Sequence, residues 1–262
     1  AYMTRRAVVI GAGHYLPERV VENAEFEKTL DTSDEWIRSR SGIERRHFAA
    51  EGETTSDLAT KAAQRALDQA GLAANDIDAI VLATPTADLT FPSAASMVQA
   101  KLGMDHGFAF DLQAVCAGFA YALTNANALI LSGQASRVLV IGSETFSRIM
   151  DWNDRSTSVL FRDGAAALVL EALSGDGTPE DRGILATDLN SDGRHKDILY
   201  VDGGISTQTT GFLRMQGKEV FRHAVEKLAA TAVKAMDSAG VSSEDVDWVV
   251  PHQANIRIIQ GT

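Results

Sequence analysis

The stretch ALDQAGLAANDIDAIVL at residues 66–82 decides the fold, because a close copy, AMDSAGVSSEDVDWVVP, occurs at residues 235–251. Seven of the seventeen aligned positions are identical, and the alignment needs no gap. Each copy is typical of a helix that ends at a glycine, followed by a short loop and an apolar strand. A repeat with this long period indicates duplicated half-domains rather than a solenoid of short repeats.

The repeat also predicts the domain organisation. We expect a first half at residues 1–172 and a second half at residues 173–262. The counterparts of residues 94–172 would then be missing from the second half. On this basis we expect the sequence to be a piece of a longer protein.

Hydrophobic patterning outside the repeat predicts an α/β fold. Apolar runs predict strands at residues 8–10, 78–83, 108–112, 138–141 and 165–170, and helices are expected at 57–70, at about 93–102 and after residue 116. Since strands and helices alternate, we expect a mainly parallel sheet.

Composition excludes several classes of function. The net charge of −11 makes a general nucleic-acid binder improbable, and a single cysteine excludes an intramolecular disulfide and fits a reducing, cytoplasmic compartment. Six scattered histidines show no zinc-type spacing, so we expect no metal site. No apolar run is long enough to span a membrane or to form a signal peptide.

The single cysteine, Cys116, follows the apolar run FAFDL at residues 108–112 and opens the helical pattern CAGFAYAL at residues 116–123. A thiol at the start of a helix lies near unpaired backbone N–H groups and the positive end of the helix dipole. Both favour the thiolate, so the position suits a nucleophile. The alternative is a small buried hydrophobic residue without chemistry.

His252 directly follows Pro251, at the carboxyl end of the strand predicted for the second copy of the repeat. Ligands of open α/β sheets bind at this edge. A neutral imidazole there could donate a hydrogen bond to a carbonyl that gains negative charge. A purely structural histidine is the alternative.

Two glycine-containing segments carry no predicted chemistry. Gly11-Ala12-Gly13 lacks the third glycine of a dinucleotide-binding fingerprint, because Leu16 stands in its place, and we interpret it as a tight turn. Asp163-Gly164 is likewise expected to form a turn that leads into a strand.

Residues 31–42 predict a short capped helix that carries Trp36 and Arg40 four residues apart on one face. Such a pair can stack on a heterocycle and contact a phosphate, although a surface aromatic beside a solvated arginine is the alternative. A basic stripe on a second helix, formed by Arg214, Lys218 and Arg222, suits an acidic partner or is simply a solvated face.

Seven segments together resemble the β-ketoacyl-acyl-carrier-protein synthase III family, the initiating condensing enzymes of bacterial fatty-acid synthesis within the thiolase superfamily. They are GAGHYLPERVV (11–21), DTSDEWIRSRSGIERRH (31–47), FPSAAS (91–96), AVCAGFAYAL (114–123), Asp154-Arg155, FRDGAAALVL (161–170) and WVVPHQANIRII (248–259). The resemblance implies a thiolase-like five-layer α-β-α-β-α fold, with the second half incomplete, and a homodimer.

The resemblance also implies a reaction and its residues. Cys116 would take the acyl group of acetyl-CoA or another short acyl-CoA, and His252 would polarise the carbonyl of malonyl-acyl-carrier protein as CO2 leaves. Trp36 and Arg155 match the pair that holds the adenine of CoA, and Arg40 would contact its phosphate. No separate cofactor is implied, since the CoA thioester is a substrate.

The remaining matches concern the pocket and the partner. Phe91 matches a residue that reaches across the dimer to the acyl pocket, and Met215, Gly217 and Phe221 match the wall of the pantetheine tunnel. Carrier-protein docking is implied for Arg222, Gln253, Ala254, Asn255, Ile256 and Arg257.

The sequence departs from the family pattern in one respect. The third catalytic residue of the family is an asparagine beyond the helix that follows the histidine, and with the glycine-rich oxyanion segment it would fall past Thr262. Two alternatives stay open: a related condensing enzyme or acyltransferase of secondary metabolism, and an inactive fragment that binds CoA or carrier protein.

Overall fold

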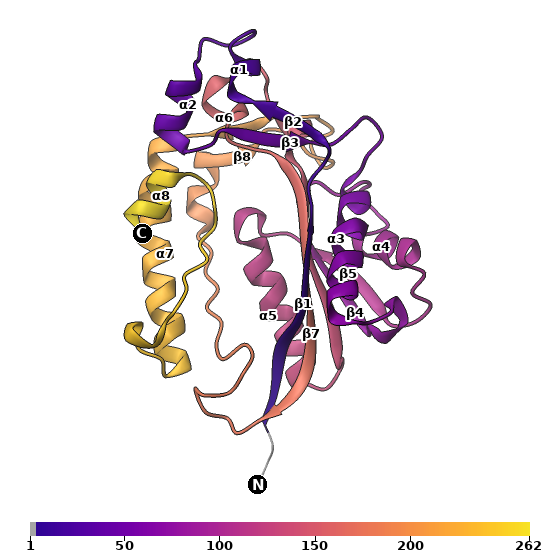
Figure 1. Cartoon of the computed structure of the whole chain (residues 1–262). Helices are drawn as coiled ribbons and strands as arrows, with labels where there is room; N and C mark the ends of the chain where they lie inside the picture. The colour runs from indigo at the N-terminus through magenta and orange to yellow at the C-terminus, as the bar shows by residue number, and fades with distance from the viewer. Residues whose placement is uncertain (1–3) are drawn as a thin grey trace.

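The computed structural model describes residues 4–262 and contains a twisted five-stranded sheet with strand order β1-β7-β6-β4-β5 (Figure 1). The strands are β1 (Thr4–Tyr15), β4 (Ala79–Ala83), β5 (Phe108–Leu112), β6 (Arg137–Thr145) and β7 (Asp163–Gly175). β4 pairs in parallel with β5 and β6, whereas β7 pairs antiparallel with β1 and β6.

The expectation of a mainly parallel sheet is confirmed, because β1, β4, β5 and β6 run in the same direction and only β7 runs opposite to them in this sheet. Parallel neighbours need a crossover helix. Helices α4 (Ala94–Leu102) and α5 (Gly118–Leu131) supply these crossovers between β4, β5 and β6. Between β6 and β7 the chain forms only η3 (Phe146–Ile149) and α6 (Arg155–Ser158), and β7 returns antiparallel beside β6.

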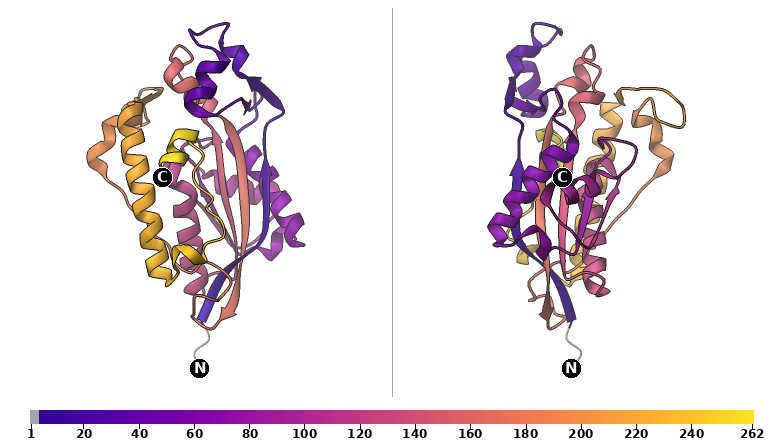
Figure 2. Two further views of the ribbon diagram at one scale, coloured as in Figure 1. Left: turned by 60° about the vertical axis from the view of Figure 1, so that its left-hand side comes forward. Right: turned by 90° about the vertical axis from the view of Figure 1, so that its right-hand side faces the viewer.

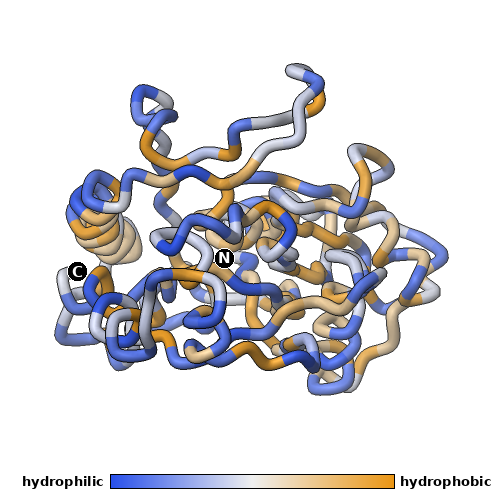
Figure 3. The backbone as a smooth tube through the Cα atoms, turned by 90° about the horizontal axis from the view of Figure 1, so that it is seen from above, coloured by the Kyte–Doolittle hydropathy of each residue, from blue (hydrophilic) through white to orange (hydrophobic). Residues whose placement is uncertain are grey.

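Helices cover both faces of the sheet (Figures 1 and 2). α3 (Thr55–Ala70) and α4 pack on one face, where a buried cluster includes Leu58, Ile80 and Ile141. α5 packs on the other face around Val81, Ile130 and Val140. The hydropathy colouring in Figure 3 shows apolar segments in the interior strands and mostly hydrophilic loops at the periphery.

The second half consists mainly of α7 (Gly217–Ala239), η5 (Ser243–Asp245) and α8 (Ile256–Gly261). The repeat is confirmed at atomic detail where its helices end. Gly71 has φ and ψ of 69° and 31°, and Gly240 has 70° and 30°. In both copies the residue after the glycine donates its N–H to a carbonyl five residues back, which is a Schellman-type end.

The strand predicted after the second copy is absent from the described structure, although its counterpart β4 is present. Residues 246–250 pair with no strand, and Trp248, Val249 and Val250 are 86%, 78% and 88% exposed. A strand needs a hydrogen-bonding neighbour, and none lies beside this segment within residues 4–262. His252 therefore follows a loop rather than the end of a paired strand.

The smaller elements complete the chain. They are β2 (Arg19–Glu22), α1 (Asn23–Phe26), α2 (Asp34–Ser41), β3 (Arg45–Phe48), η1 (Ala74–Asp76), η2 (Val115–Ala117), η4 (Gly193–Ile198), β8 (Leu199–Val201) and β9 (Leu213–Met215). β2 pairs with β3 and β8 with β9, both antiparallel. No helix within residues 4–262 has both the length and the apolar character required to cross a membrane.

Gly11 and Gly13 lie inside β1, so the turn expected at this segment is wrong. A Cβ on Gly13 would lie 2.4 Å from the backbone nitrogen of Ala66, and one on Gly11 would lie 2.5 Å from the carbonyl oxygen of Ala66. The two glycines let α3 approach the strand closely, which a pattern of turn-forming residues does not reveal.

Candidate active site

Cys116 lies in the short turn η2, which connects the carboxyl end of β5 to α5. The α-helix begins at Gly118, two residues later than the sequence pattern indicates. Val115, just before the cysteine, has a φ of 48°. This left-handed conformation is unfavourable for a β-branched residue, and such strain is typical of functional turns. The turn presents the Cys116 side chain at the surface of the described chain.

The thiol of Cys116 is less acidic than its position suggests. Although the side chain is exposed, the surrounding protein desolvates the sulfur, and together with the nearby Glu144 carboxyl this raises the pKa of the thiol. A backbone hydrogen bond to the sulfur lowers the pKa but is the smallest contribution. The prediction that the helix start favours the thiolate is therefore wrong in its net direction.

Glu144 is a residue of the site that sequence reasoning missed. It lies near the carboxyl end of β6, where its Oε2 accepts hydrogen bonds from Thr86 Oγ1 at 2.6 Å and Thr84 Oγ1 at 3.4 Å. Burial raises the pKa of Glu144 to about 8 despite these bonds, and the charge of Asp163 adds to the effect. The carboxyl group is thus mostly protonated at pH 7.

A signal for this cluster does exist in the sequence. Thr84 and Glu144 follow two apolar runs that are adjacent strands of the sheet, and Cys116 follows a third. The carboxyl ends of parallel strands share one edge, so polar residues after each run are candidates for one site.

His252 lies in the loop between η5 and α8. Its side chain is exposed, but the protein around it partly desolvates the imidazole, and with the charge of Arg162 this lowers the pKa of His252 below its ordinary value. The imidazole is therefore neutral at pH 7. Nη2 of Arg162 donates a hydrogen bond to the carbonyl oxygen of Gln253 at 3.3 Å.

Two neighbouring residues at the start of β7 influence the titration of different residues of the candidate site. The charge of Asp163, the first residue of β7, helps to raise the pKa of Glu144, and Glu144 helps to raise the pKa of the Cys116 thiol. The charge of its neighbour Arg162 helps to lower the pKa of His252. Asp163 itself is buried and accepts hydrogen bonds from the backbone N–H groups of Ala49 and Ser147, both at 2.8 Å. The turn expected at Asp163-Gly164 is wrong, because both residues belong to β7 and pair with β6.

Two guanidinium groups lie close to the indole ring of Trp36. The Cζ atom of Arg40 lies 4.3 Å from the centre of the indole ring, and that of Arg155 lies 5.0 Å from it. Arg40 shares the face of α2 with Trp36, as its spacing predicts, whereas Arg155 comes from α6. Arg155 also donates a hydrogen bond to the carbonyl oxygen of Asp31 at 2.6 Å. The helix expected within residues 31–42 is confirmed as α2, capped by Ser33 and ended by Gly42.

The candidate tunnel residues lie together, and the candidate dimer residue protrudes. Met215 belongs to β9, Gly217 is the first residue of α7, and Phe221 lies one turn further along that helix. A Cβ on Gly217 would lie 3.7 Å from Cε of Met215. Phe91 is 81% exposed in the isolated chain.

The prediction that Arg214 belongs to a basic stripe on one helix is wrong. This residue lies in β9, because α7 begins only at Gly217, and its guanidinium forms ion pairs with Asp151 and Asp202, both at 2.8 Å. Lys218 and Arg222 do lie on α7.

The segment after His252 opens α8, as its pattern predicts. Asn255 caps this helix, since its side chain accepts a hydrogen bond from the N–H of Ile258 at 2.9 Å. Gln253 and Ala254 precede the cap, and Arg257 is exposed on the first turn. Ile256 packs against Gly42 at the end of α2, so the segment is tied to the helix that carries Trp36.

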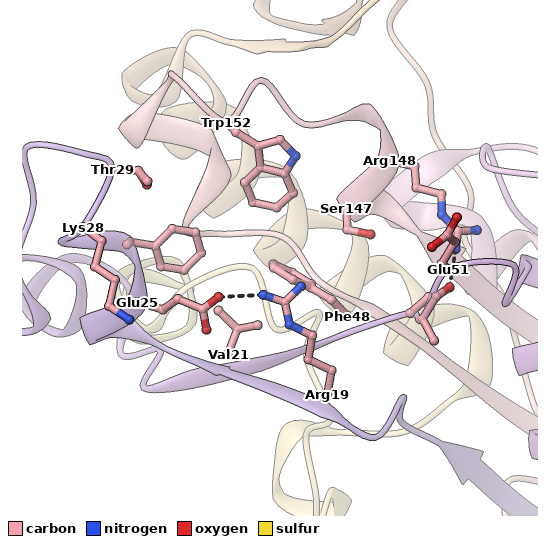
Figure 4. A pocket seen from close by; sticks show the side chains of 13 residues that line it. Arg19, Val21, Glu25, Lys28, Thr29, Phe48, Glu51, Ser147, Arg148 and Trp152 are labelled. Carbon is pink, nitrogen blue, oxygen red and sulfur yellow. Dashed lines mark hydrogen bonds and ion pairs between the residues drawn. The ribbon is translucent and has the colours of Figure 1, made fainter.

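A pocket of about 610 Å³ lies beside β2, β3 and η3 (Figure 4). Phe48 and Trp152 lie on its apolar side, and Arg19 and Arg148 lie at its charged rim. Neither Cys116 nor His252 lines it. Within residues 4–262, no group of three or more histidine, cysteine or acidic side chains is arranged to hold a metal ion.

Comparisons with known proteins agree with this geometry. The family model described as 3-Oxoacyl-[acyl-carrier-protein (ACP)] synthase III matches residues 110–193, and its C-terminal counterpart matches residues 236–262. Relatives named "Beta-ketoacyl-[acyl-carrier-protein] synthase III" from Ruegeria sp. (strain TM1040) and Ruegeria pomeroyi are 79% and 80% identical over 260 residues, which is 99% of this chain and 80% of each relative.

Solved structures give the same picture. A 3-oxoacyl-[acyl-carrier-protein] synthase III from Aquifex aeolicus superimposes with a TM-score of 0.90 at 45% identity, covering 97% of this chain and 79% of that one. A priming β-ketosynthase of a polyketide biosynthetic pathway has a TM-score of 0.90 at 34% identity, covering 100% of this chain and 78% of that one.

Proposed function

The chain belongs to the β-ketoacyl-acyl-carrier-protein synthase III family, and on that premise we propose that it condenses a short acyl-CoA, such as acetyl-CoA, with malonyl-acyl-carrier protein. The products are 3-oxoacyl-acyl-carrier protein, CoA and CO2. This acyltransferase reaction initiates fatty-acid synthesis. The observation that carries the proposal is Cys116, which is exposed on the strained turn at the carboxyl end of β5.

In the first half-reaction, the sulfur of Cys116 attacks the thioester carbonyl of acyl-CoA. A carbon–sulfur bond to the protein forms, the bond to the CoA sulfur breaks, and the thiol proton leaves with CoA. Because the pKa of Cys116 is raised, the resting thiol is protonated, and its proton must be released as the substrate reacts. The strained turn at Val115 holds the sulfur at the surface, where a thioester can approach.

In the second half-reaction, the malonyl group loses CO2, and the electron pair of the broken carbon–carbon bond attacks the acyl-cysteine carbonyl. The Cys116 sulfur is then the leaving group. A neutral His252 has one ring N–H to donate to the malonyl thioester carbonyl, whose oxygen gains negative charge. The lowered pKa of His252 supports this neutral role.

We assign substrate binding to three groups of residues. Trp36 and Arg155 hold the adenine of CoA, and Arg40 contacts its phosphate; the closeness of both guanidinium groups to the indole supports this assignment. Met215, Gly217 and Phe221 form the wall of the pantetheine tunnel. CoA thioesters are substrates in this scheme, and no resident cofactor takes part.

The proposal extends to partners and assembly. Arg222 on α7 and the segment Gln253–Arg257 at the start of α8 form the docking surface for the acidic carrier protein. Phe91 reaches into a second copy of the chain, so the active form is a homodimer. We place the protein in the cytoplasm, and we assign residues 1–172 and 173–262 to two thiolase-like halves.

The intact protein mass after incubation with a panel of acyl-CoAs tests the proposal. We expect the mass to increase by one acyl group with a preferred chain length, because Cys116 forms a thioester. Cys116→Ser is the matched control and should abolish a thioester that is cleaved by hydroxylamine. An unmodified wild-type chain in the presence of every acyl-CoA would favour a protein that only binds CoA or carrier protein.

A further inference from the structure

Arg162 is a half-buried cation without an anionic partner. It lies between α6 and β7, directly before Asp163. Burial lowers its pKa, and no carboxylate within residues 4–262 forms an ion pair with it. The carboxylate of Asp163 is occupied elsewhere, since it accepts hydrogen bonds from Ala49 and Ser147. Leaving a guanidinium partly buried and unpaired is unfavourable, which indicates a role for its charge.

The one hydrogen bond of Arg162 within the described chain leads to the loop that carries His252. Nη2 of Arg162 donates to the carbonyl oxygen of Gln253 at 3.3 Å. Arg162 belongs to the first half of the chain and Gln253 to the second, 91 residues further on. This contact fixes the backbone immediately after His252 against the corner that opens β7.

Arg162 also influences a second cation, Arg46, whose pKa is lowered by burial and by the charge of Arg162. Arg46 is fully buried, and its guanidinium donates to uncharged oxygens of Val21, Asn23 and Val159, so it brings no carboxylate to Arg162.

Of the charged groups on the described elements around His252, only Arg162 shifts the pKa of the imidazole. Arg40 of α2 and Arg257 of α8 are exposed and contribute no shift. The charge beside His252 is therefore the charge of Arg162.

We propose that Arg162 is the positioning residue for His252: its guanidinium anchors the loop through the carbonyl of Gln253 and so holds a fixed positive charge at the residue next to His252. The inference rests on the proposed role of His252 in condensation. A neutral imidazole retains one N–H donor and one free lone pair, and it forms no ion pair with the Cys116 thiolate released in the second half-reaction.

Titration of His252 by NMR tests the inference directly. The chain has six histidines, and the His252 resonance is identified by its loss in His252→Asn. In the wild type we expect His252 to titrate below the ordinary histidine value. Arg162→Gln should raise this pKa toward the ordinary histidine value, because a neighbouring positive charge is removed.

Two variants make the titration specific. Arg162→Lys keeps the charge and should leave most of the shift in place. Arg65→Gln is the matched control, because Arg65 is an exposed arginine on α3, across the sheet, that donates to the carbonyl oxygen of His14 at 2.7 Å. An unchanged His252 titration in a folded Arg162→Gln variant overturns the inference, as does an equal shift in Arg65→Gln.

Condensation assays give a second readout. Because its His252 pKa is raised, Arg162→Gln should begin to lose activity at a higher pH than the wild type does as the pH falls from 8. A profile that falls in parallel with the wild type contradicts the role. Acylation of Cys116 in the wild type tests the proposed function separately. A failure of the proposed function can therefore be distinguished from a failure of the positioning role of Arg162.

Discussion

Replacing Glu144 with glutamine should change both the stability and the reactivity of the site in a pH-dependent way. Burial raises the pKa of Glu144 from 4.5 to about 8, so the folded chain holds this proton more tightly than the unfolded chain does. The protonated carboxyl contributes its full stability below the unfolded pKa, and that contribution is lost as the pH rises to about 8. Glutamine keeps an oxygen for Thr86 to donate to, but it has no proton to lose.

The size of the effect follows from the shift in pKa. A shift from 4.5 to about 8, at about 1.36 kcal/mol per unit, corresponds to about 5 kcal/mol in the free energy of unfolding. Urea denaturation from pH 5 to 8.5 measures it. The wild type should lose stability relative to Glu144→Gln as the pH rises across this range. A difference between the two proteins that stays constant with pH would refute the reasoning.

The same variant should change the alkylation of Cys116 only above the pKa of Glu144. Below pH 8 the wild-type carboxyl is mostly neutral and adds little to the thiol pKa, so both proteins should react with iodoacetamide at the same rate. Above pH 8 the carboxylate opposes the thiolate, so Glu144→Gln should react faster than the wild type. A rate ratio that is the same at pH 7 and pH 9.5 would contradict the contact between the two groups.

Three further predictions concern packing, the repeat and CoA binding. Gly13→Ala should destabilise the chain by about 3 kcal/mol in urea denaturation because its Cβ would lie 2.4 Å from a backbone nitrogen of α3, whereas Gly193→Ala, with no atom within 4 Å, should stay within about 0.5 kcal/mol. Gly71→Ala and Gly240→Ala should each cost about 1 kcal/mol, since both glycines have a positive φ of 69° and 70°, and unequal costs would argue against equivalent helix ends. CoA should quench the fluorescence of Trp36, and a titration with Trp36→Phe, which leaves the other two tryptophans, should remove that change.

Features that depend on neighbouring residues were predictable from the sequence. Helices α3 and α7 each end at a glycine whose N–H donates a hydrogen bond to the preceding turn, so the repeated sequence was enough to predict both helix ends. Helix α2 is bounded by Ser33 and Gly42, and its Trp36 and Arg40 contact each other because they are four residues apart. In these cases a few adjacent residues determine the geometry.

Features that depend on distant partners were not predictable in the same way. Arg214 fits the spacing of a basic helix, but its pairing with Asp151 and Asp202 places it in a strand. The glycines of β1 look like turn residues until the close approach of α3 is known. Residues 246–250 repeat the pattern of β4, yet a strand requires a partner that the pattern itself does not supply.

Cys116 shows why the electrostatics of the site follow from the fold rather than from the local sequence. The residues around it indicate a helix start, which favours the thiolate, and the small backbone contribution to its pKa has that sign. The larger contributions come from desolvation and from Glu144 on β6, which β4 separates from β5 in the sheet. Because these raise the pKa, the nucleophile is stored as a thiol, and its proton leaves only when a thioester reacts. Reactivity at this site should therefore respond more strongly to changes at Glu144 and Thr86 than to changes in the helix that follows the cysteine.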